Sequence, residues 1–360
     1  MELIQSVITI VLFLFILGIL VLVHEVGHYI TARLARIRVL EFGIGFPPRA
    51  RVLRSEGETL WTLNWLPIGG FVKLEGEDGD AADDPRSFSN APLVTRLLIL
   101  VAGVLMNVLL AFAIFAGIAL TGDPTIGVRA GVVDPGSPAA AAGMQAGDLV
   151  ASVNGRYFSA FGGERILDVI RDNAGQTVRL GIERDGRTIG LEVTLREEAE
   201  ISPTRGALGI SGLASRTTSF TIGHDLGESA AIGVDRTTGA MNLILGGLGE
   251  LVAAIGRPTE PPPASGPVGI AIQIGDVFWA LGPIVTLYLA GVLSANLAVV
   301  NILPFPPLDG GRMLVLVLKS VFGRRLSLRV ERLTYLVGFV FLFAFLIWVT
   351  GFDLLRQFGG

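Results

Sequence analysis

The sequence predicts a polytopic α-helical membrane protein with about four transmembrane helices, a membrane-associated β-hairpin region and an inserted α+β module. The chain is 51% hydrophobic and only 17% charged, which is too apolar for an ordinary soluble protein. Its longest apolar runs lie near 3–23, 92–120, 281–303 and 333–352, and each is long enough to cross a bilayer. Residues 124–198 have soluble composition with short strand, helix and turn signals between them.

Charge and cysteine content narrow the classes of function. The net charge is −4, so we expect no large basic face and no nucleic-acid partner. The chain has no cysteine, which excludes disulfides and thiolate metal sites. Any metal ion must therefore be held by histidine, aspartate, glutamate or backbone oxygen.

The first apolar run leads into the pattern His24-Glu25-x-x-His28. On a helix, positions i and i+4 lie on one face, so both imidazoles can reach one metal ion. Glu25, beside the first histidine, is placed to act as general base on a water molecule, as in zinc hydrolases. Two of the three histidines of the chain fall in this pattern. The alternative is a pair of histidines at the headgroup level, but ionisable groups in spanning helices are costly and usually functional.

Flanking charges predict the orientation of the first helix. A signal peptide would have a basic start and a small-residue cleavage site, whereas this run follows Glu2 and has no Ala-x-Ala. Arg33, Arg36 and Arg38 follow the run, so this end is expected in the cytoplasm and the N-terminus outside.

The region 37–91 differs from its flanks. Between 38 and 75, short alternating runs broken by Gly and Pro predict a small sheet of hairpins, and residues 75–90 are acidic and polar. Glycines punctuate the stretch 67–73, so an exposed strand edge there could pair with an extended substrate. The alternative is a plain amphipathic hairpin on the membrane surface.

The second span contains Gly103-x-x-x-Asn107. A small residue allows close helix approach, and an asparagine in a span needs a polar partner; ordinary helix packing is the alternative. The inserted module then reads as strands at Thr125–Val133, Leu149–Asn154, Val178–Glu183 and Thr188–Leu195, with helices at Ser137–Ala142 and Glu164–Asn173. Residues 199–221 resemble a polar linker, and 222–256 an amphipathic helix at the outer interface.

The third span ends in a break that carries a carboxylate. Pro304, Pro306 and Pro307 must interrupt the helix, and irregular backbone at membrane depth is tolerated only in protein or around a wet cavity. Asp309, just past the break, is the candidate third metal ligand, with a helix N-cap as the alternative. The next loop, 312–332, is basic and expected in the cytoplasm, and the fourth span returns the C-terminus outside.

These motifs together resemble the site-2 protease family of intramembrane zinc metalloproteases (peptidase family M50), in its bacterial RseP-like branch with one PDZ domain. The resemblance covers nearly the whole chain. It depends on the HExxH motif at 24–28 and on the family's NxxPxPxLDG motif, matched at 301–310. Weaker matches are Phe42–Phe46, Pro67–Lys73, Gly103 with Asn107 (where Val104 replaces a common proline), Ser265–Ile270, and the PDZ-like stretches at 136–140, 142–148 and 153–155.

The resemblance implies the roles of the residues. His24, His28 and Asp309 would bind one Zn²⁺ per chain, and Glu25 would activate water. The substrate would contact Asn301, Asn107 and the strand Gly70, Phe71, Val72 and Lys73, and the PDZ ligand loop would fall near Ile126, Gly127 and Val128. Family substrates are single-span membrane proteins already cut by another protease, often anti-sigma factors. The PDZ domain would exclude uncut substrates by bulk or sense new C-termini.

The resemblance also implies a location and a division of the chain. The protein would reside in the bacterial inner membrane, with the active site toward the cytoplasm and the PDZ domain outside. The division is 1–36 (first span), 37–91 (β region and acidic loop), 92–121 (second span), 124–198 (PDZ domain), 199–280 (linker and interfacial segment), 281–311 (third span), 312–332 (basic loop) and 333–353 (fourth span).

Two other functions compete with a protease. A PDZ scaffold that has lost catalysis would not need Glu25 between two ligands. A metal transporter using His24, His28 and Asp309 should show ionisable residues throughout its spans, and the second and fourth spans have almost none in their interiors.

Overall fold

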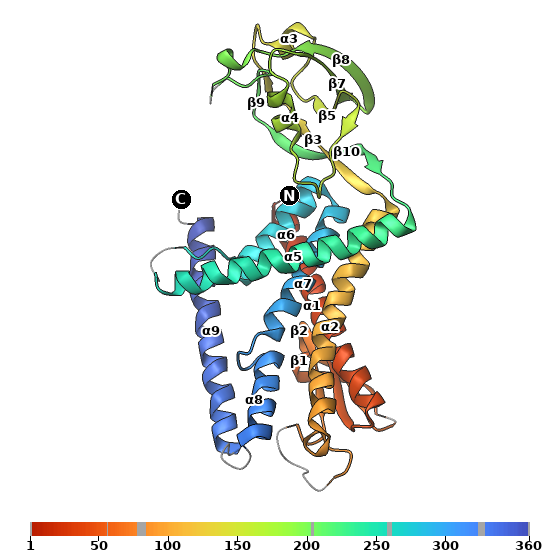
Figure 1. The fold of residues 1–360 in the computed structure, drawn as a ribbon, viewed down its shortest axis with the longest axis vertical. Coiled ribbons are helices and arrows are strands. Elements are labelled where there is room, and N and C mark those ends of the chain that lie inside the picture. The colour runs from red at the N-terminus through yellow and green to blue at the C-terminus, as the bar shows by residue number, and fades with distance from the viewer. Residues whose placement is uncertain are drawn as a thin grey trace. The chain divides into compact units, whose positions relative to one another are not determined.

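A computed structural model describes residues 2–55, 57–77, 84–202, 205–257, 261–322 and 328–358 (Figure 1). Part of the acidic loop (78–83), and Arg324 and Arg325 of the basic loop, lie outside the described residues. The chain forms two compact units. The first comprises Met1–Phe115, Gly233–Asp276 and Leu289–Gly360, and the second Ala116–Ile232 and Val277–Tyr288.

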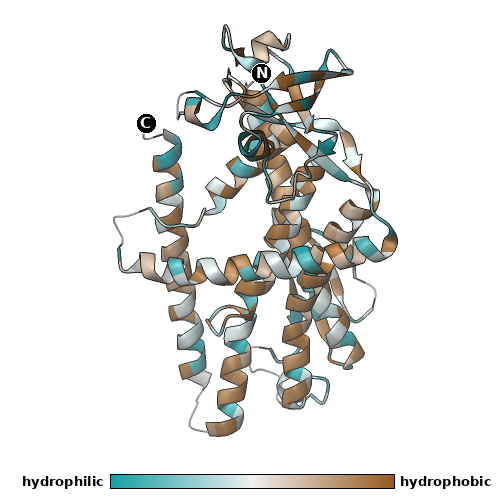
Figure 2. Cartoon of the chain, turned by 45° about the horizontal axis from the view of Figure 1, so that its top comes forward, coloured by the Kyte–Doolittle hydropathy of each residue, from teal (hydrophilic) through white to brown (hydrophobic). Residues whose placement is uncertain are grey.

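Four long apolar helices account for the predicted spans. They are α1 (Glu2–Leu34), α2 (Leu93–Thr121), α7 (Pro283–Ile302) and α9 (Leu328–Phe358). In the part of the chain that is described, these four are long and apolar enough to cross a membrane, and Figure 2 shows hydrophobic residues along most of their length. Exposed side chains such as Phe15 and Phe343 are large and apolar, as expected of helices that face lipid. The predicted number of spans is confirmed.

Helix α1 extends well beyond the apolar run, so the HExxH motif lies inside a continuous helix. The helix ends at Leu34, with Arg33 in the last turn, where a cation interacts favourably with the helix dipole. Tyr29, next to His28, packs against the rings of Phe42 and Trp61, with centroid distances of 5.5 and 5.3 Å. The α1 helix is thereby fixed against the following strands.

The region after α1 is the predicted small sheet, made of β1 (Val39–Arg54) and β2 (Leu60–Leu74). Both strands are long and irregular, so that the segment of β1 around Phe42–Ile44 pairs on one side with Trp61–Leu63 and on the other with Gly70–Val72. The Gly70–Lys73 segment is therefore an outer strand of this sheet. Its second edge pairs with no other strand of the described chain.

A short apolar helix precedes the third span and was not predicted as a separate element. Helix α6 (Pro267–Leu281) is separated from α7 by Gly282, whose φ of +85° favours glycine. Asp353 of α9 is only 4% exposed and accepts a hydrogen bond from the backbone N–H of Gly269 at 2.8 Å. A Cβ at Gly266 or Gly269 would lie within 2.8 Å of this carboxylate, which explains the glycines of the 265–270 stretch.

The second unit contains the predicted α+β module. Its main sheet has the order β10-β3-β5-β7-β8, formed by β3 (Asp123–Arg129), β5 (Leu149–Val153), β7 (Thr177–Arg184), β8 (Arg187–Thr194) and β10 (Ala214–Ile222), with β6 (Arg156–Tyr157) paired to β5. β4 (Val132–Val133) pairs with β9 (Ile210–Ser211). Helices α3 (Pro138–Ala141) and α4 (Ile166–Asp172) complete the module. Its core includes Val150, Leu180, Ile182 and Val193.

The predicted linker at 199–221 is wrong, because the chain returns there to the sheet. β9 and β10 lie in this segment, and β10 pairs antiparallel with β3. β10 is an outer strand with mostly exposed or half-buried polar side chains, so its sequence lacks the apolar alternation that marks a strand. The following residues form a helix as predicted, α5 (Leu226–Ile255).

A buried ion pair joins two parts of this module. The Asp148 carboxylate is 1% exposed and accepts hydrogen bonds from Arg184 Nε and a terminal Arg184 nitrogen, both at 2.7 Å, and from the Gln145 N–H at 2.8 Å. Burial raises the pKa of Asp148, but the hydrogen bonds from Arg184 and Gln145 outweigh it and hold the pKa below its ordinary value. The carboxylate is therefore more acidic when the module is folded.

We predict that this pair makes the stability of the module depend on pH. A depressed folded pKa contributes stability above the unfolded value of about 3.9, and this stability is lost as pH falls through the folded pKa. Asp148→Asn should remove this pH dependence and lower the stability of the module above about pH 4, because the amide loses the charge-assisted hydrogen bonds from Arg184. Hydrogen exchange of the full chain, read at β5 and β7 between pH 3 and 7, measures both effects. Equal exchange in the two proteins across this range would contradict the prediction.

Candidate metal centre

Three predicted ligands meet in the first unit although they lie far apart in the sequence. His24 and His28 come from α1, and Asp309 is the first residue of α8 (Asp309–Phe322). His24 Nε2 lies 2.9 Å from Asp309 Oδ2 and 3.1 Å from His28 Nε2. The distance from His28 Nε2 to Asp309 Oδ2 is 3.4 Å. Both histidines are buried.

These distances fit a zinc site. Ligand atoms at about 2.0–2.1 Å from zinc in tetrahedral geometry lie roughly 3.3–3.4 Å from one another. Two imidazole nitrogens and a carboxylate oxygen are all suitable zinc ligands, and the three atoms converge on one point. In the described part of the chain, these are the only three His, Asp or Glu residues so placed. Three protein ligands leave a fourth position open, as in catalytic zinc sites.

Hydrogen bonds to the other ring nitrogens orient both imidazoles. His28 Nδ1 lies 2.8 Å from the Ile99 carbonyl, to which it donates, so Nε2 is left for the metal. His24 Nδ1 lies 3.4 Å from the side-chain nitrogen of Asn107, whose Oδ1 is buried with no hydrogen-bond partner. Rotating the amide by 180° lets this oxygen accept the His24 Nδ1 proton, and the two amide positions are not distinguished by shape. The position of Asn107 favours orientation of His24 over the predicted contact with substrate.

Glycines bring the helices close enough for this site. A Cβ at Gly103 of α2 would lie 2.5 Å from His28 Nε2 and 2.8 Å from His24 Cε1, so any side chain there would occupy the space of the rings. A Cβ at Gly27 would lie 2.7 Å from Met106 Cγ and closer still to the Ala102 carbonyl. Ser294 of α7 donates a hydrogen bond to the Asn107 carbonyl at 2.8 Å, which ties α7 to the same face of α2.

The proline-rich loop places the aspartate. Helix α7 ends at Ile302, and a turn closed by the Leu308 N–H to Phe305 carbonyl bond at 2.9 Å leads into α8. Gly310 and Gly311 pack directly against the backbone of Ile302 and Phe305, leaving no room for a Cβ. On the other side, Gly338 of α9 contacts Pro306, and Phe341 packs on Phe305 at a centroid distance of 5.4 Å. The Asp309 carboxylate thus points at the imidazoles.

Glu25 lies in a cavity of about 210 Å³ beside the ligands. His28, Asp309 and the strand residues Gly70, Phe71 and Val72 also line this cavity. A Cβ at Gly70 would lie 3.8 Å from Glu25 Cγ, so the outer strand of the sheet passes close to the base. A carboxylate, two of the candidate metal ligands and an unpaired strand edge therefore share one cavity, which is an arrangement suited to hydrolysing an extended peptide.

Not every predicted residue reaches this cavity. Asn301 lies in the last turn of α7, and neither Asn301 nor Lys73 is among the residues that line the cavity. In the second unit, Ile126, Gly127 and Val128 lie in β3, which pairs with β10 on one side and with β5 at Val128. They offer no free strand edge to a peptide. The hollow of that unit lies instead between α4 and the segment 206–213.

One residue that lines the Glu25 cavity was not identified from the sequence. Arg312, three residues after Asp309, lines the cavity and pairs with Glu77 at 2.5 Å. It was assigned only to the basic cytoplasmic loop. Its signal is its position one helical turn beyond a metal ligand, which places it over the same site.

We predict that a methyl group at Gly103 removes the metal. Gly103→Ala should lower zinc affinity about 10- to 100-fold, because the imidazoles lose their positions. Gly117→Ala is the matched control, since it lies on the same helix and a Cβ there meets no atom within 4 Å. Zinc per chain, measured by elemental mass spectrometry on protein purified in detergent, should fall only in the first variant. Wild-type zinc content in Gly103→Ala would contradict the role of this glycine.

Comparison with known proteins agrees with this geometry. The model of peptidase family M50 matches residues 12–345. A protein of Clostridium acetobutylicum named "putative zinc metalloprotease" is 31% identical over 352 residues, covering 96% of this chain and 97% of that protein. Proteins with the same designation from Nostoc sp. and Brucella suis are each 29% identical, covering 91% and 96% of this chain and 90% and 95% of their own lengths. The chain belongs to peptidase family M50 and is a zinc metalloprotease of the membrane.

Proposed function

We propose that this chain cleaves peptide bonds within the transmembrane segments of other membrane proteins. The substrates would be single-span proteins already shortened by another protease, such as anti-sigma factors, and the reaction would be the second cut of regulated intramembrane proteolysis. The observation that carries the proposal is the cavity that Glu25 shares with His28, Asp309 and the strand edge at Gly70–Val72, with His24 beside these two ligands. This cavity is built on two helices that are long and apolar enough to span a bilayer.

The residues of the site divide the work of hydrolysis. His24, His28 and Asp309 would hold one zinc ion, which polarises the scissile carbonyl and lowers the pKa of a water molecule. Glu25 takes a proton from that water and passes it to the leaving amine. The Gly70–Val72 edge can hydrogen-bond an unwound substrate as an added strand, which exposes a peptide bond that a helix would shield.

Two substitutions distinguish the role of a general base from that of a metal ligand. Glu25→Gln should keep zinc but lose cleavage by at least about 100-fold, because an amide cannot accept the proton. Asp309→Asn should lose both zinc and cleavage. The measurement is cleavage of a single-span reporter in detergent, with zinc determined on the same samples. Undiminished cleavage by Glu25→Gln would contradict the protease proposal and leave a scaffold or a transporter as the working interpretation.

The α+β module would be a single PDZ domain outside the cytoplasm. Its hollow, of about 420 Å³ between α4 and 206–213, is lined by apolar residues such as Ile170 and Leu208 and suits an extended peptide end. Four arginines lie at or just beyond the C-terminal end of α1 and the N-terminal ends of α2 and α9: Arg33, Arg36, Arg96 and Arg332. This excess of positive charge supports a cytoplasmic location for these helix ends and for the metal centre. In a bacterium, the host membrane would be the inner membrane.

Because the chain has no cysteine, its orientation can be measured with single introduced thiols. Arg187→Cys, at the exposed start of β8, should react with a membrane-impermeant maleimide in intact spheroplasts. Arg54→Cys, at the exposed end of β1, should react only after the membrane is disrupted. The reverse labelling pattern would place the module in the cytoplasm and contradict the proposed orientation.

A further inference from the structure

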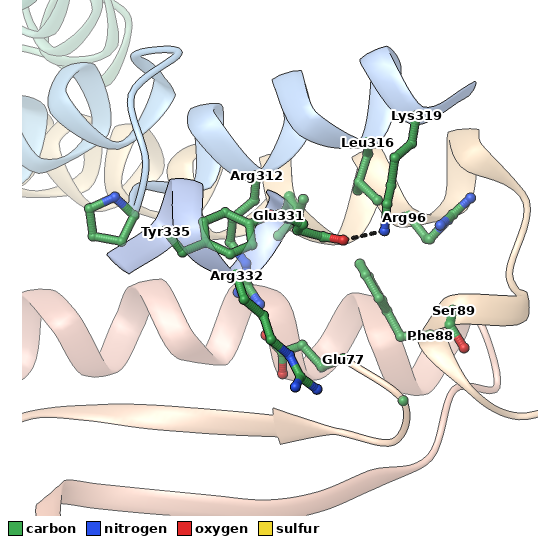
Figure 3. A pocket seen from close by; sticks show the side chains of 13 residues that line it. Glu77, Phe88, Ser89, Arg96, Arg312, Leu316, Lys319, Glu331, Arg332 and Tyr335 are labelled. Atoms are coloured by element: carbon green, nitrogen blue, oxygen red, sulfur yellow. Dashed lines mark hydrogen bonds and ion pairs between the residues drawn. The ribbon is translucent and has the colours of Figure 1, made fainter. Parts of the chain in front are cut away.

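A second cavity of the first unit adjoins the cavity that holds Glu25 and has a different chemistry. It has a volume of about 290 Å³ and is lined by four basic side chains, Arg96, Arg312, Lys319 and Arg332, and by two carboxylates, Glu77 and Glu331. Figure 3 shows that these side chains come from the turn after β2, from α2, from α8 and from α9. The cavity is therefore a meeting point of several elements rather than a feature of one helix.

Two of the cations are neutralised within the cavity and two are not. Lys319 pairs with Glu331, and Arg312 pairs with Glu77. Among the described residues, neither Arg96 nor Arg332 has a carboxylate within 4 Å, and Glu331, which pairs with Lys319, is the carboxylate whose charge acts on Arg96. Arg96 Nε is buried and has no hydrogen-bond acceptor. A buried guanidinium donor without an acceptor costs free energy, and the four cations of the lining exceed its two carboxylates, so the cavity favours an added anion.

The location of the cavity agrees with a membrane ligand. Arg96 is in the first turn of α2 and Arg332 near the start of α9, while Lys319 is in the last turn of α8 (Figure 1). These are ends of apolar helices, where the hydrocarbon region gives way to headgroups. Basic pockets between transmembrane helices bind the phosphates of anionic headgroups.

The chemistry of the donors selects the ligand class. Arginine presents a planar set of N–H donors that matches the oxygens of a phosphate group. Figure 3 shows Arg96 beside Lys319 at one side of the cavity and Arg332 near Glu77 at the other, so cationic groups flank the cavity on both sides. Ser89 and Tyr335 add hydroxyl groups to the lining. A carboxylate would use fewer of these donors than a phosphate.

We propose that this cavity is a binding site for a phosphate group, held by Arg96 and Arg332 with Lys319 beside them. The phosphate can belong to an anionic phospholipid headgroup or to a soluble phosphate, and the two sources share this recognition chemistry. The proposal is independent of the cleavage reaction. It adds a ligand site next to the metal cavity, because Glu77, Phe88, Leu100 and Arg312 line both.

The test uses the full chain, purified and delipidated in detergent. In one arm, equal amounts of phosphatidylglycerol and phosphatidylethanolamine are added and the retained lipid is measured by native mass spectrometry. In the other arm, the thermal unfolding midpoint is measured in inorganic phosphate and in chloride of the same ionic strength. The variants are Arg96→Gln, Arg332→Gln and the double variant, with Arg51→Gln, an exposed cation of β1 outside the cavity, as the matched control.

The expected result is preferential retention of phosphatidylglycerol, stabilisation by phosphate, or both, by the wild type and Arg51→Gln. The double variant should bind at least tenfold more weakly. Preference only for the lipid assigns the site to a headgroup, and stabilisation only by phosphate assigns it to a soluble ligand. Arg332 is exposed at the start of α9, so Arg332→Gln alone keeps the test valid if the double variant does not fold.

Two results would overturn the proposal. One is equal retention of both lipids together with no difference between phosphate and chloride. The other concerns Asp78, Asp80 and Asp83, which follow Glu77 in the sequence and lie outside the described residues. If phosphate binds only after all three are changed to Asn, the chain supplies its own anion to these cations. The cavity is then not a ligand site.

Discussion

The convergence of three electron-pair donors at about 3 Å is the constraint on which the rest of the first unit depends. Two imidazole nitrogens and a carboxylate oxygen are held within ligand distance of one another, and the surrounding backbone keeps them there. This support comes from close packing at glycine residues. Gly27 and Gly103 let α1 and α2 approach, and Gly310 lets the proline loop fold onto the end of α7. The metal centre thus depends on three packing contacts at which a glycine, having no side chain, lets the helices come close.

The polar groups inside these apolar helices follow a common rule. Asn107, Ser294 and Asp353 are all buried, and each contacts either backbone or a metal-ligating ring. An unpaired polar group at membrane depth is costly, so each such residue must have a fixed partner. Because the partner is fixed, the polar residues determine which helix faces meet. In these spans they contribute specificity of packing as well as chemistry.

The convergence of His24, His28 and Asp309, with Glu25 beside them, could be predicted from the sequence because the pattern is local. His24 and His28 are one helical turn apart, Glu25 adjoins them, and the absence of cysteine leaves Asp309 as a suitable donor beside a helix break. The spans followed from length and composition. What the sequence did not reveal is set by distant contacts: the space that Gly103 leaves for both rings, the Asn107 contact with His24, and the separate helix α6. The strand β10 was missed because an outer strand of polar residues has no apolar period.

Helix α9 contacts two parts of the first unit that matter for the site. At one point it holds the proline loop through Gly338 and Phe341, and at another it binds the start of α6 through Asp353. The loop in turn carries Asp309. Displacement of α9 would therefore move the loop, draw a ligand away from the two histidines and weaken metal binding. Retention of the metal is therefore coupled to the position of α9, although α9 supplies no ligand itself.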